Sequence, residues 1–407
     1  MRLIIFNVGQ GDCILLELPG QGWGLVDCHF APEQAVPPVL AWLNRLGIKD
    51  LEFICLSHPD YDHFKGMMTV IHHVHNNGGT VKRFWIFGVM PVRDIHRGLR
   101  QAAREAKMTS DASPGHRPVI TAEEVRYHSA REREFAAILR YIADRLKQDE
   151  RESAKSEAKQ DYRRRFSYRR LIGPAHVRTF DDVRLYCLAP TSAAVEDYES
   201  VLWSNPFSTS PSEERENNCV SVVLGLMFGE TIIVLGGDAG KRQWKSVFRA
   251  LEDVTEHFPT KADFLKTSHH GSRHGCDASV LLELSAEGMT VAISADFTTN
   301  LYGHPHTETL NHLAELAQKG LVKTVYCTNR SPQCVEFGDR DLHVDLSDLP
   351  LDQRHCYELF SSESATPTTA NACFGTCEFE ITKDHEVRLV SKDGPAQACW
   401  ISRPTTS

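Results

Sequence analysis

Short apolar runs recur along the chain and alternate with amphipathic segments and glycine-rich turns. Runs of this length predict buried strands, and apolar residues that repeat every three to four positions predict helices. Alternation of the two indicates an α/β fold. We expect strands at 3–6 and 13–16 (a hairpin around a glycine-rich turn), 23–28, 51–56, 81–87, 183–190, 217–224, 231–238, 262–266, 291–295 and 322–326, and helices at 35–46, 67–74 and 310–320.

The pattern changes between residues 93 and 170, where the chain becomes helical in character, highly charged and poor in large apolar residues. This stretch holds 20 Lys and Arg against 13 Asp and Glu, a net charge of +7, whereas the rest of the chain has a net charge of −16. We therefore divide the chain into a first core half (1–90), a basic helical insertion (91–180), a second core half (181–330) and a C-terminal extension (331–407). In the extension, residues 377–381 and 386–390 are expected to form a β-hairpin.

Aromatic residues and arginines interleave at the end of the insertion. This pattern suits contacts with a phosphate backbone together with stacking on bases. The residues expected to bind substrate here are Arg163, Arg164, Arg165, Arg169 and Arg170. Two other interpretations are a surface that docks an acidic protein partner and, for the helices, a solvated helical hairpin with ion pairs among residues such as Arg131, Arg133 and Glu134.

Composition limits the class of protein. A chain of 407 residues that is 41% hydrophobic can build a sizeable core. No apolar run approaches the roughly 18 residues of a membrane span, and strand-like sequence at the start leaves no room for a signal peptide. We expect a cytoplasmic protein without membrane contact. Among its scattered cysteines, Cys13, Cys28, Cys55, Cys187 and Cys219 lie in or beside apolar runs and are expected to be reduced core residues.

Four groups able to bind a metal follow the apolar run 51–56 directly: His58, Asp60, Asp62 and His63. Imidazole and carboxylate ligands together suit Zn²⁺, Mn²⁺ or Fe²⁺. His58 and Asp60 can serve one ion while Asp62 and His63 serve a second. The alternative is a polar loop in which an aspartate caps the next helix, but burying two carboxylates without a counter-ion is costly.

The order of these ligands resembles the H-x-H-x-D-H loop of the metallo-β-lactamase superfamily, with Asp60 in place of the middle histidine. Four further stretches resemble motifs of the ComEC-type branch of that superfamily: "NVGQGDCILL", "NNCVSVVL" followed by "IIVLGGDAG", "ADFLKTSHHGS" and "NLYGHP". Phosphorylcholine esterases of the same superfamily look similar. The resemblance covers about residues 1–90 and 181–330.

The resemblance implies an αββα sandwich, carrying here a charged helical insertion and a C-terminal β-rich extension. It also implies that Asp238 bridges two metals and that His269 completes the second metal site. Asp27 is implied to support the segment from His58 to His63, which we call the metal loop. Asn218 stands near where many relatives have a histidine ligand, and its amide oxygen is a weaker ligand for zinc. The remaining expected roles are phosphate contact or proton donation for His270, and substrate contact for Ser272, Tyr302 and His304, with metal ligation as the alternative for His304.

Hydrolysis by a metal-bound hydroxide is the commonest chemistry on such a site. Asp62 is expected both to hold metal and to orient the water. With one or two Zn²⁺ ions, or Mn²⁺ or Mg²⁺, we expect a phosphodiesterase or nuclease that acts on DNA or RNA. Stand-alone relatives occur in multi-protein bacterial systems, including antiviral ones, so a place in such a system is a further expectation. The alternatives are a hydrolase of small phosphoesters or other esters, and a non-catalytic metal-binding subunit.

Overall fold

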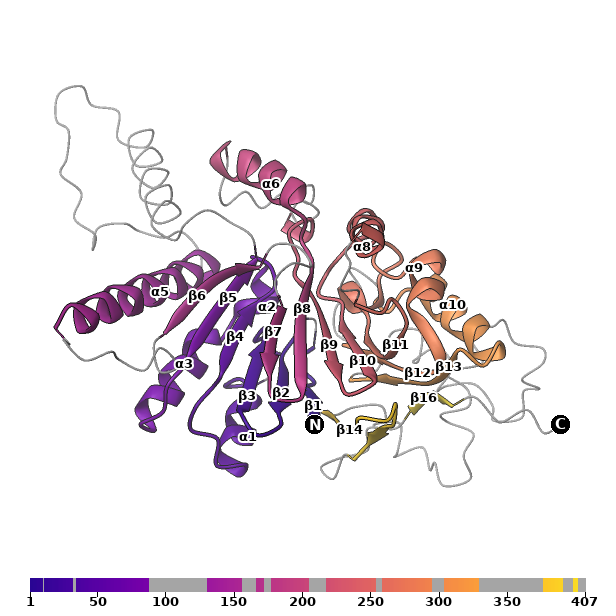
Figure 1. Ribbon diagram of the computed structural model, residues 1–407, viewed down its shortest axis with the longest axis horizontal. Helices are drawn as coiled ribbons and strands as arrows, with labels where there is room; N and C mark the ends of the chain where they lie inside the picture. The colour runs from indigo at the N-terminus through magenta and orange to yellow at the C-terminus, as the bar shows by residue number, and fades with distance from the viewer. Residues whose placement is uncertain are drawn as a thin grey trace.

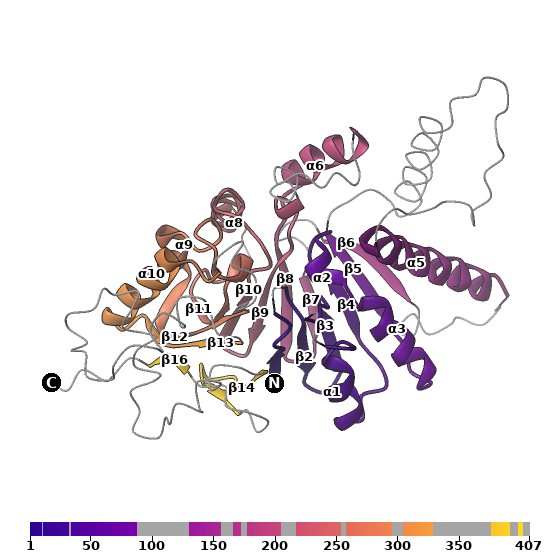
Figure 2. The ribbon, with the colours of Figure 1, turned by 180° about the vertical axis from the view of Figure 1, so that it is seen from behind.

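A computed structural model describes residues 1–9, 11–31, 34–87, 130–155, 166–171, 177–204, 217–253, 258–294, 304–328, 376–390 and 398–401. Two eight-stranded sheets pack face to face, with helices on the outer side of each (Figure 1). This is the αββα sandwich that the sequence predicted. The same two-sheet arrangement is seen from behind in Figure 2.

The first sheet has the strand order β15-β14-β1-β2-β3-β4-β5-β6. Its strands are β1 (Arg2–Ile5), β2 (Ile14–Leu18), β3 (Gly22–Val26), β4 (Phe53–Leu56), β5 (Arg83–Phe87), β6 (Ser167–Leu171), β14 (Cys377–Ile381) and β15 (Val387–Leu389). Strands β14 to β3 pair antiparallel, and β3 to β6 pair parallel.

The second sheet has the order β16-β13-β12-β11-β10-β9-β8-β7. Its strands are β7 (Val177–Phe180), β8 (Val183–Ala189), β9 (Val223–Phe228), β10 (Thr231–Leu235), β11 (Ala262–Lys266), β12 (Ser285–Ile293), β13 (Val322–Cys327) and β16 (Ala398–Ile401). Strands β7 to β10 pair antiparallel and β10 to β13 pair parallel, so each sheet joins an antiparallel half to a parallel half.

Helices cover the two outer faces. On the first sheet lie α1 (Val39–Arg45), α2 (Tyr61–Phe64), α3 (Met67–Asn76) and α5 (Ala130–Lys155). On the second lie α8 (Lys241–Asp253), α9 (Ala278–Leu284) and α10 (Thr307–Gln318), while α6 (Ser192–Ser204) follows β8. Apolar side chains fill the space between the sheets, and a second apolar cluster joins the second sheet to its helices. In the part of the chain that the structure describes, no helix is long and apolar enough to span a membrane.

The apolar pattern located most elements correctly, because buried strands need continuous apolar runs. The tail hairpin is confirmed as β14 and β15. One strand was predicted to begin too early: residues 217–220 form a helical turn, β9 begins at Val223, and Cys219 is exposed rather than part of the core. The strands β6 and β7 lie within the stretch expected to be a helical insertion, where they form one edge of each sheet.

Candidate metal centre

The topology brings chain segments that are distant in sequence to one edge of the sandwich. Strands β3 and β4 run parallel, as do β10, β11 and β12, so their carboxyl ends lie on common edges. Five polar segments follow or precede strands at this edge: Asp27 after β3, the metal loop after β4, Asp238 after β10, the His269–His270 turn after β11, and Asp12 before β2. Parallel α/β sheets characteristically place their sites at this end of the strands.

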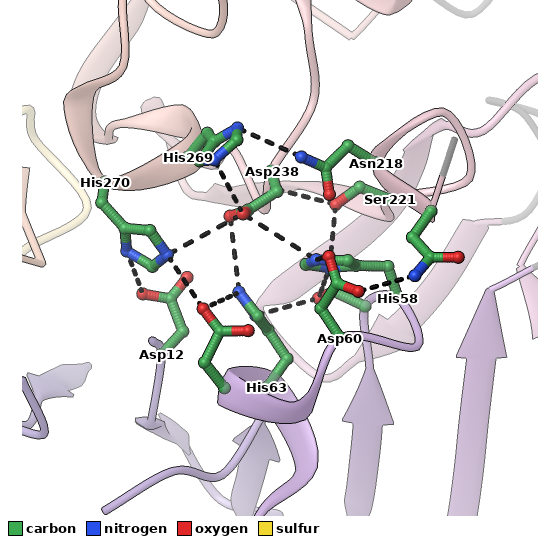
Figure 3. Close-up of polar contacts among 12 residues, drawn as sticks. Asp12, His58, Asp60, His63, Asn218, Ser221, Asp238, His269 and His270 are labelled. Atoms are coloured by element: carbon green, nitrogen blue, oxygen red, sulfur yellow. Dashed lines mark hydrogen bonds and ion pairs between the residues drawn. The ribbon is translucent and has the colours of Figure 1, made fainter. Parts of the chain in front are cut away.

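The metal loop places both of its histidines in the interior. His58 and His63 are fully buried, and their rings lie 4.1 Å apart, centre to centre (Figure 3). His58 Nε2 lies 3.4 Å from Asp60 Oδ2, and His63 Nε2 lies 3.9 Å from Asp62 Oδ2. Gly11 makes the loop's packing feasible: a Cβ at this position would lie 2.2 Å from the Asp62 carbonyl oxygen.

Asp238 lies at the centre of the cluster (Figure 3). Its two carboxylate oxygens face different histidines. Asp238 Oδ1 lies 3.5 Å from His63 Nε2, and Asp238 Oδ2 lies 3.8 Å from His58 Nε2 and 3.8 Å from His270 Nε2. The backbone N–H of Asp238 donates to Ser221 Oγ at 2.7 Å, which fixes the carboxylate between the two sheets.

His269 and His270 sit differently although they are neighbours in sequence. The His270 side chain is 1% exposed, and its Nε2 lies 3.7 Å from Asp62 Oδ2. The His269 side chain is 29% exposed, lies 3.9 Å from Asp238 Oδ2, and contacts Asn218 through its other ring nitrogen. Both residues have left-handed backbone conformations, with φ of 48° and 53°. Such φ values are uncommon outside glycine and often mark functional sites.

Asp27 orients the metal loop. Its carboxylate accepts hydrogen bonds from Ser57 N and Ser57 Oγ, and Asp27 Oδ2 lies 2.8 Å from His63 Nδ1. His63 therefore directs its remaining nitrogen, Nε2, toward Asp238 and Asp62. A carboxylate behind a histidine in this way fixes the ring orientation and raises its basicity toward a metal.

Asp12 occupies the corresponding position behind His270. Asp12 Oδ1 lies 3.9 Å from His270 Nδ1. The carboxylate forms a very short ion pair with Lys266, which is fully buried, and accepts a hydrogen bond from Ser294 Oγ at 2.6 Å. Both histidines that face Asp62 thus have an aspartate on the far side of the ring.

The donor set fits divalent cations. Five aspartates converge here, Asp12, Asp27, Asp60, Asp62 and Asp238, against the cations Lys266 and Arg131. The polar atoms His63 Nε2, Asp238 Oδ1 and His270 Nε2 are buried without a hydrogen-bond partner. His63 Nε2 lies 3.5 Å from Asp238 Oδ1, and His270 Nε2 lies 3.7 Å from Asp62 Oδ2 and 3.8 Å from Asp238 Oδ2. These distances exceed a hydrogen bond but match atoms that share one ion, since bonds of about 2.1 Å give a tetrahedral edge of about 3.4 Å. Among the described residues, three groups of possible ligands share His63: His58–His63–Asp238, Asp62–His63–His270 and Asp12–Asp27–His63. The first two adjoin each other at Asp238, whereas Asp27 in the third contacts His63 from behind the ring.

The electrostatics of the cluster agree with this donor set. Burial by itself raises the pKa of Asp238, but His269, His63 and His270 outweigh it and hold that pKa well below its usual range. Burial lowers the pKa of His63, but Asp238, Asp27 and Asp62 raise it well above its ordinary value. Both shifts have the same cause, because carboxylates and imidazoles that lie close together in the interior each favour the charged form of the other.

Other predicted residues lie near the cluster but contact it differently. Asn218 Nδ2 lies 3.2 Å from His269 Nδ1. The hydroxyl of Ser272 accepts a hydrogen bond from Gly275 N, so it stabilises its own turn. The His304 ring packs against His269 at 5.2 Å, and burial, with His269 and His270, lowers the pKa of His304 to about 3. Tyr302, Arg163, Arg164 and Arg165 lie outside the described residues; Arg169 and Arg170 lie on β6.

Several residues of the cluster had no assigned role in the sequence. Asn217 donates to Asp60, and Ser221 holds Asp238; both lie in or beside the "NNCVSVVL" stretch, which identified the segment but not these side chains. Burial lowers the pKa of His29, two residues after Asp27, to about 4, and this ring packs beside Gly11. Arg131 reaches Asp60 from α5, and no local pattern in the sequence indicated that contact.

One family model matches part of the chain. Residues 6–140 match the model of the metallo-beta-lactamase superfamily. No curated protein matches the chain. Similar solved structures are a mutant of CmlA beta-hydroxylase (9% identity, TM-score 0.37, covering 81% of this chain and 53% of that chain), a diphosphatase from the PhnP family (11%, 0.31, 72% and 86%) and unliganded yeast PDE1 (12%, 0.36, 79% and 95%).

This chain therefore spans about half the length of the CmlA beta-hydroxylase chain. With TM-scores below 0.5, none of these likenesses carries a functional argument. The family match covers residues 6–140, and the described His/Asp cluster offers side chains that could hold a metal ion.

Proposed function

We propose that this protein is a phosphodiesterase that cleaves DNA or RNA with two divalent cations. The observation that carries the proposal is the placement of Asp238, whose two oxygens face His63 on one side and His58 and His270 on the other. A carboxylate between two adjoining ligand groups suits a pair of cations. Two cations close together can contact both the attacking and the leaving oxygen of a phosphodiester.

The ligands divide into two groups around Asp238. His58, Asp60 and Asp238 would hold one ion, and Asp62, His63 and His270 would hold the other together with Asp238. The buried His270 is the better ligand, and the more exposed His269 is left to contact the substrate phosphate or to protonate the leaving oxygen, which exchanges the roles suggested by the sequence. When bound, the cations lower the pKa of a water so that it can act as a nucleophile near neutral pH.

The other residues position and protect this chemistry. Asp62 would accept a hydrogen bond from the attacking water, Asp27 orients the His63 ring through Nδ1, and Asp12 lies 3.9 Å behind Nδ1 of His270. His304 stays neutral at pH 7, because burial and two histidines lower its pKa to about 3, so it acts as a hydrogen-bonding group for the substrate.

The basic residues of β6 support a polyanionic substrate. β6 runs parallel to β5 and β5 parallel to β4, so the carboxyl end of β6 shares an edge with the metal loop. Two strand spacings of about 4.8 Å separate β6 from β4, and Arg169 and Arg170 are half-buried near that end. A core with a net charge of −16 repels phosphates, so a nuclease needs a basic approach to its site.

A substrate panel with metal analysis tests the proposal. We expect about two equivalents of Zn²⁺, Mn²⁺ or Mg²⁺ to be required for cleavage of single- or double-stranded DNA or of RNA. Replacing Arg163, Arg164, Arg165, Arg169 and Arg170 by glutamine should weaken nucleic-acid binding and reduce its salt dependence, because fewer counterions are released.

Turnover of a small chromogenic phosphodiester is the matched control, since that substrate needs only the metals. Glutamine at five exposed basic residues of the second half, Arg242, Lys245, Arg249, Lys319 and Lys323, serves as the charge-matched control variant. Cleavage of small phosphoesters without any cleavage of nucleic acid would contradict the nuclease proposal, and equal loss of both activities in the arginine variant would assign the basic stretch a structural role.

A further inference from the structure

Helix α5, which begins at Ala130 in the charged insertion, packs directly on the metal loop. Phe135 of α5 contacts Phe64 of α2 with ring centres 5.4 Å apart, and both side chains are buried. The sequence suggested that Arg131 and Glu134 pair with charges on their own helix. Both instead reach across to the loop that carries His58, Asp60, Asp62 and His63.

Arg131 contacts the first half of the loop. Its Nη2 donates to the Pro59 carbonyl oxygen at 3.1 Å and to Asp60 Oδ1 at 3.1 Å. Asp60 Oδ1 also accepts from Asn217 Nδ2 at 2.6 Å, and Asn217 in turn is held by the Tyr198 hydroxyl at 2.8 Å. Two donors therefore engage one oxygen of Asp60.

The second oxygen of Asp60 has a different environment. Asp60 Oδ2 lies 3.4 Å from His58 Nε2, inside the metal cluster (Figure 3). Fixing Oδ1 with Arg131 and Asn217 thus presents Oδ2 alone to the cluster. Such outer partners fix the geometry of a metal ligand.

Glu134 contacts the far end of the loop. Its Oε1 accepts hydrogen bonds from Gly66 N at 3.0 Å and Met68 N at 3.3 Å. Gly66 is the N-cap of α3, has φ of 93° and has no side chain of its own to cap the helix. A carboxylate brought in from α5 supplies the missing cap. Arg131 and Glu134 lie one helical turn apart on α5. Their hydrogen bonds therefore hold the metal loop on both sides of its ligands.

We propose that Arg131 is a positioning residue for the metal site formed by His58, Asp60 and Asp238, and that α5 thereby couples the charged insertion to metal occupancy. Arg131 acts through Asp60, because it contacts none of the other ligands in the described part of the chain. Displacement of α5 from the metal loop releases Asp60 Oδ1 and lowers the metal affinity of this site alone. The second site, with Asp62, His63 and His270, retains its own orienting aspartates.

Metal titration of the apo protein tests this proposal without relying on activity. Calorimetric titration with Zn²⁺ and Mn²⁺ should show that Arg131→Ala raises the dissociation constant of one bound ion by about 10-fold or more, which is the usual effect of losing an outer partner. The dissociation constant of the other ion should not change. The matched control is Arg133→Ala, two residues along α5, whose side chain is exposed; it should bind both equivalents like wild type. The melting temperature of the metal-free protein shows whether each variant folds.

A double-mutant cycle identifies the route of the effect. Asn217→Ala removes the second donor to the same oxygen from outside α5, so it should weaken the same equivalent. In an Asp60→Ala background, Arg131→Ala should change metal affinity no further, since the residue through which it acts is absent. Unchanged or tighter metal binding by folded Arg131→Ala, an equal loss of both equivalents, or a full effect of Arg131→Ala in the Asp60→Ala background would each overturn the proposal.

Discussion

The two halves of the metal centre are built in different ways. The half after β4 is one short loop, where His58 to His63 supply four ligand groups from consecutive turns of backbone and where α5 grips both flanks. The half after β10 and β11 is assembled from separate turns, with Asp238 held by Ser221 and His270 held by a left-handed backbone. The ligands of the first half come from one continuous segment, whereas those of the second half come together only when β10 and β11 pack side by side.

This difference explains where strain and buried charge are concentrated. The turn after β11 places three consecutive residues, His269, His270 and Gly271, at positive φ. Its neighbour Lys266 is fully buried and pairs with Asp12 from the first half. The metal loop is held instead by hydrogen bonds with Asp27, Arg131 and Glu134.

The largest expected effect follows from removing the ligand at the end of the metal loop. Asp62→Ala should reduce turnover of any phosphodiester by at least about 1,000-fold, about 4 kcal/mol of transition-state stabilisation, because it removes a ligand and the group that orients water. Steady-state kinetics at limiting metal measure the effect. Asp182→Ala, an exposed aspartate in the β7–β8 turn, is the control; equal turnover of Asp62→Ala and the control would refute the role.

Substitution of the two neighbouring histidines of the second half should have different effects on metal content and turnover. His270→Ala should lose about one equivalent of bound metal and about 100-fold or more in turnover, because it removes a buried ligand. His269→Ala should keep its metal and lose less turnover, with the loss in the chemical step. Metal content by plasma emission spectroscopy decides; loss of metal only in His269→Ala would restore the assignment suggested by the sequence.

Stability tests the buried ion pair that supports the second half. Lys266→Met should lower the free energy of unfolding by about 3–5 kcal/mol, because it leaves Asp12 buried without its partner. Lys241→Met, which breaks the exposed pair with Asp277, should cost at most about 1 kcal/mol. Urea unfolding measures both. Equal losses of unfolding free energy in Lys266→Met and Lys241→Met would show that Asp12 does not depend on Lys266 for charge compensation. Such a result would also contradict a structural role for the buried pair beside His270.

The smallest effect concerns the surface pair that links α8 to α9. Burial by itself raises the pKa of Asp277, but hydrogen bonds from Lys241 and Ser279 outweigh it and lower that pKa from 3.8 to about 2. A lowered pKa contributes stability that is present above the ordinary pKa and is lost as pH falls through the folded value. Asp277→Asn should therefore be less stable than wild type by under about 1 kcal/mol at pH 7.

The stability difference between wild type and Asp277→Asn should shrink as the pH falls from about 4 to about 2, because the aspartate loses its charge over that range. Urea unfolding at a series of pH values measures it. A difference that stays constant down to pH 2 would show that the N-cap hydrogen bond to Ser279, rather than the charge, is what Asp277 contributes.

The sequence alone located most elements of the fold, and the reason is physical. A strand buried on both faces, such as β4 or β10, has to be a continuous apolar run, and a carboxylate or imidazole at its end stands out against that run. Asp62 and Asp238 were found in this way, and the spacing of His58 to His63 indicated a metal loop. The tail hairpin followed from the same reasoning, because alternating residues around a polar turn are a local signal.

Tertiary structure alone decided how these groups are used. His269 and His270 are neighbours in sequence, and only the turn between β11 and α9 buries one ring fully and leaves the other partly exposed. The contacts Arg131–Asp60 and Lys266–Asp12 join residues 71 and 254 positions apart. No local pattern encodes such pairs, because a charged side chain on a helix or after a strand has the same composition whether its partner is water, its own helix or a metal ligand brought in by the fold.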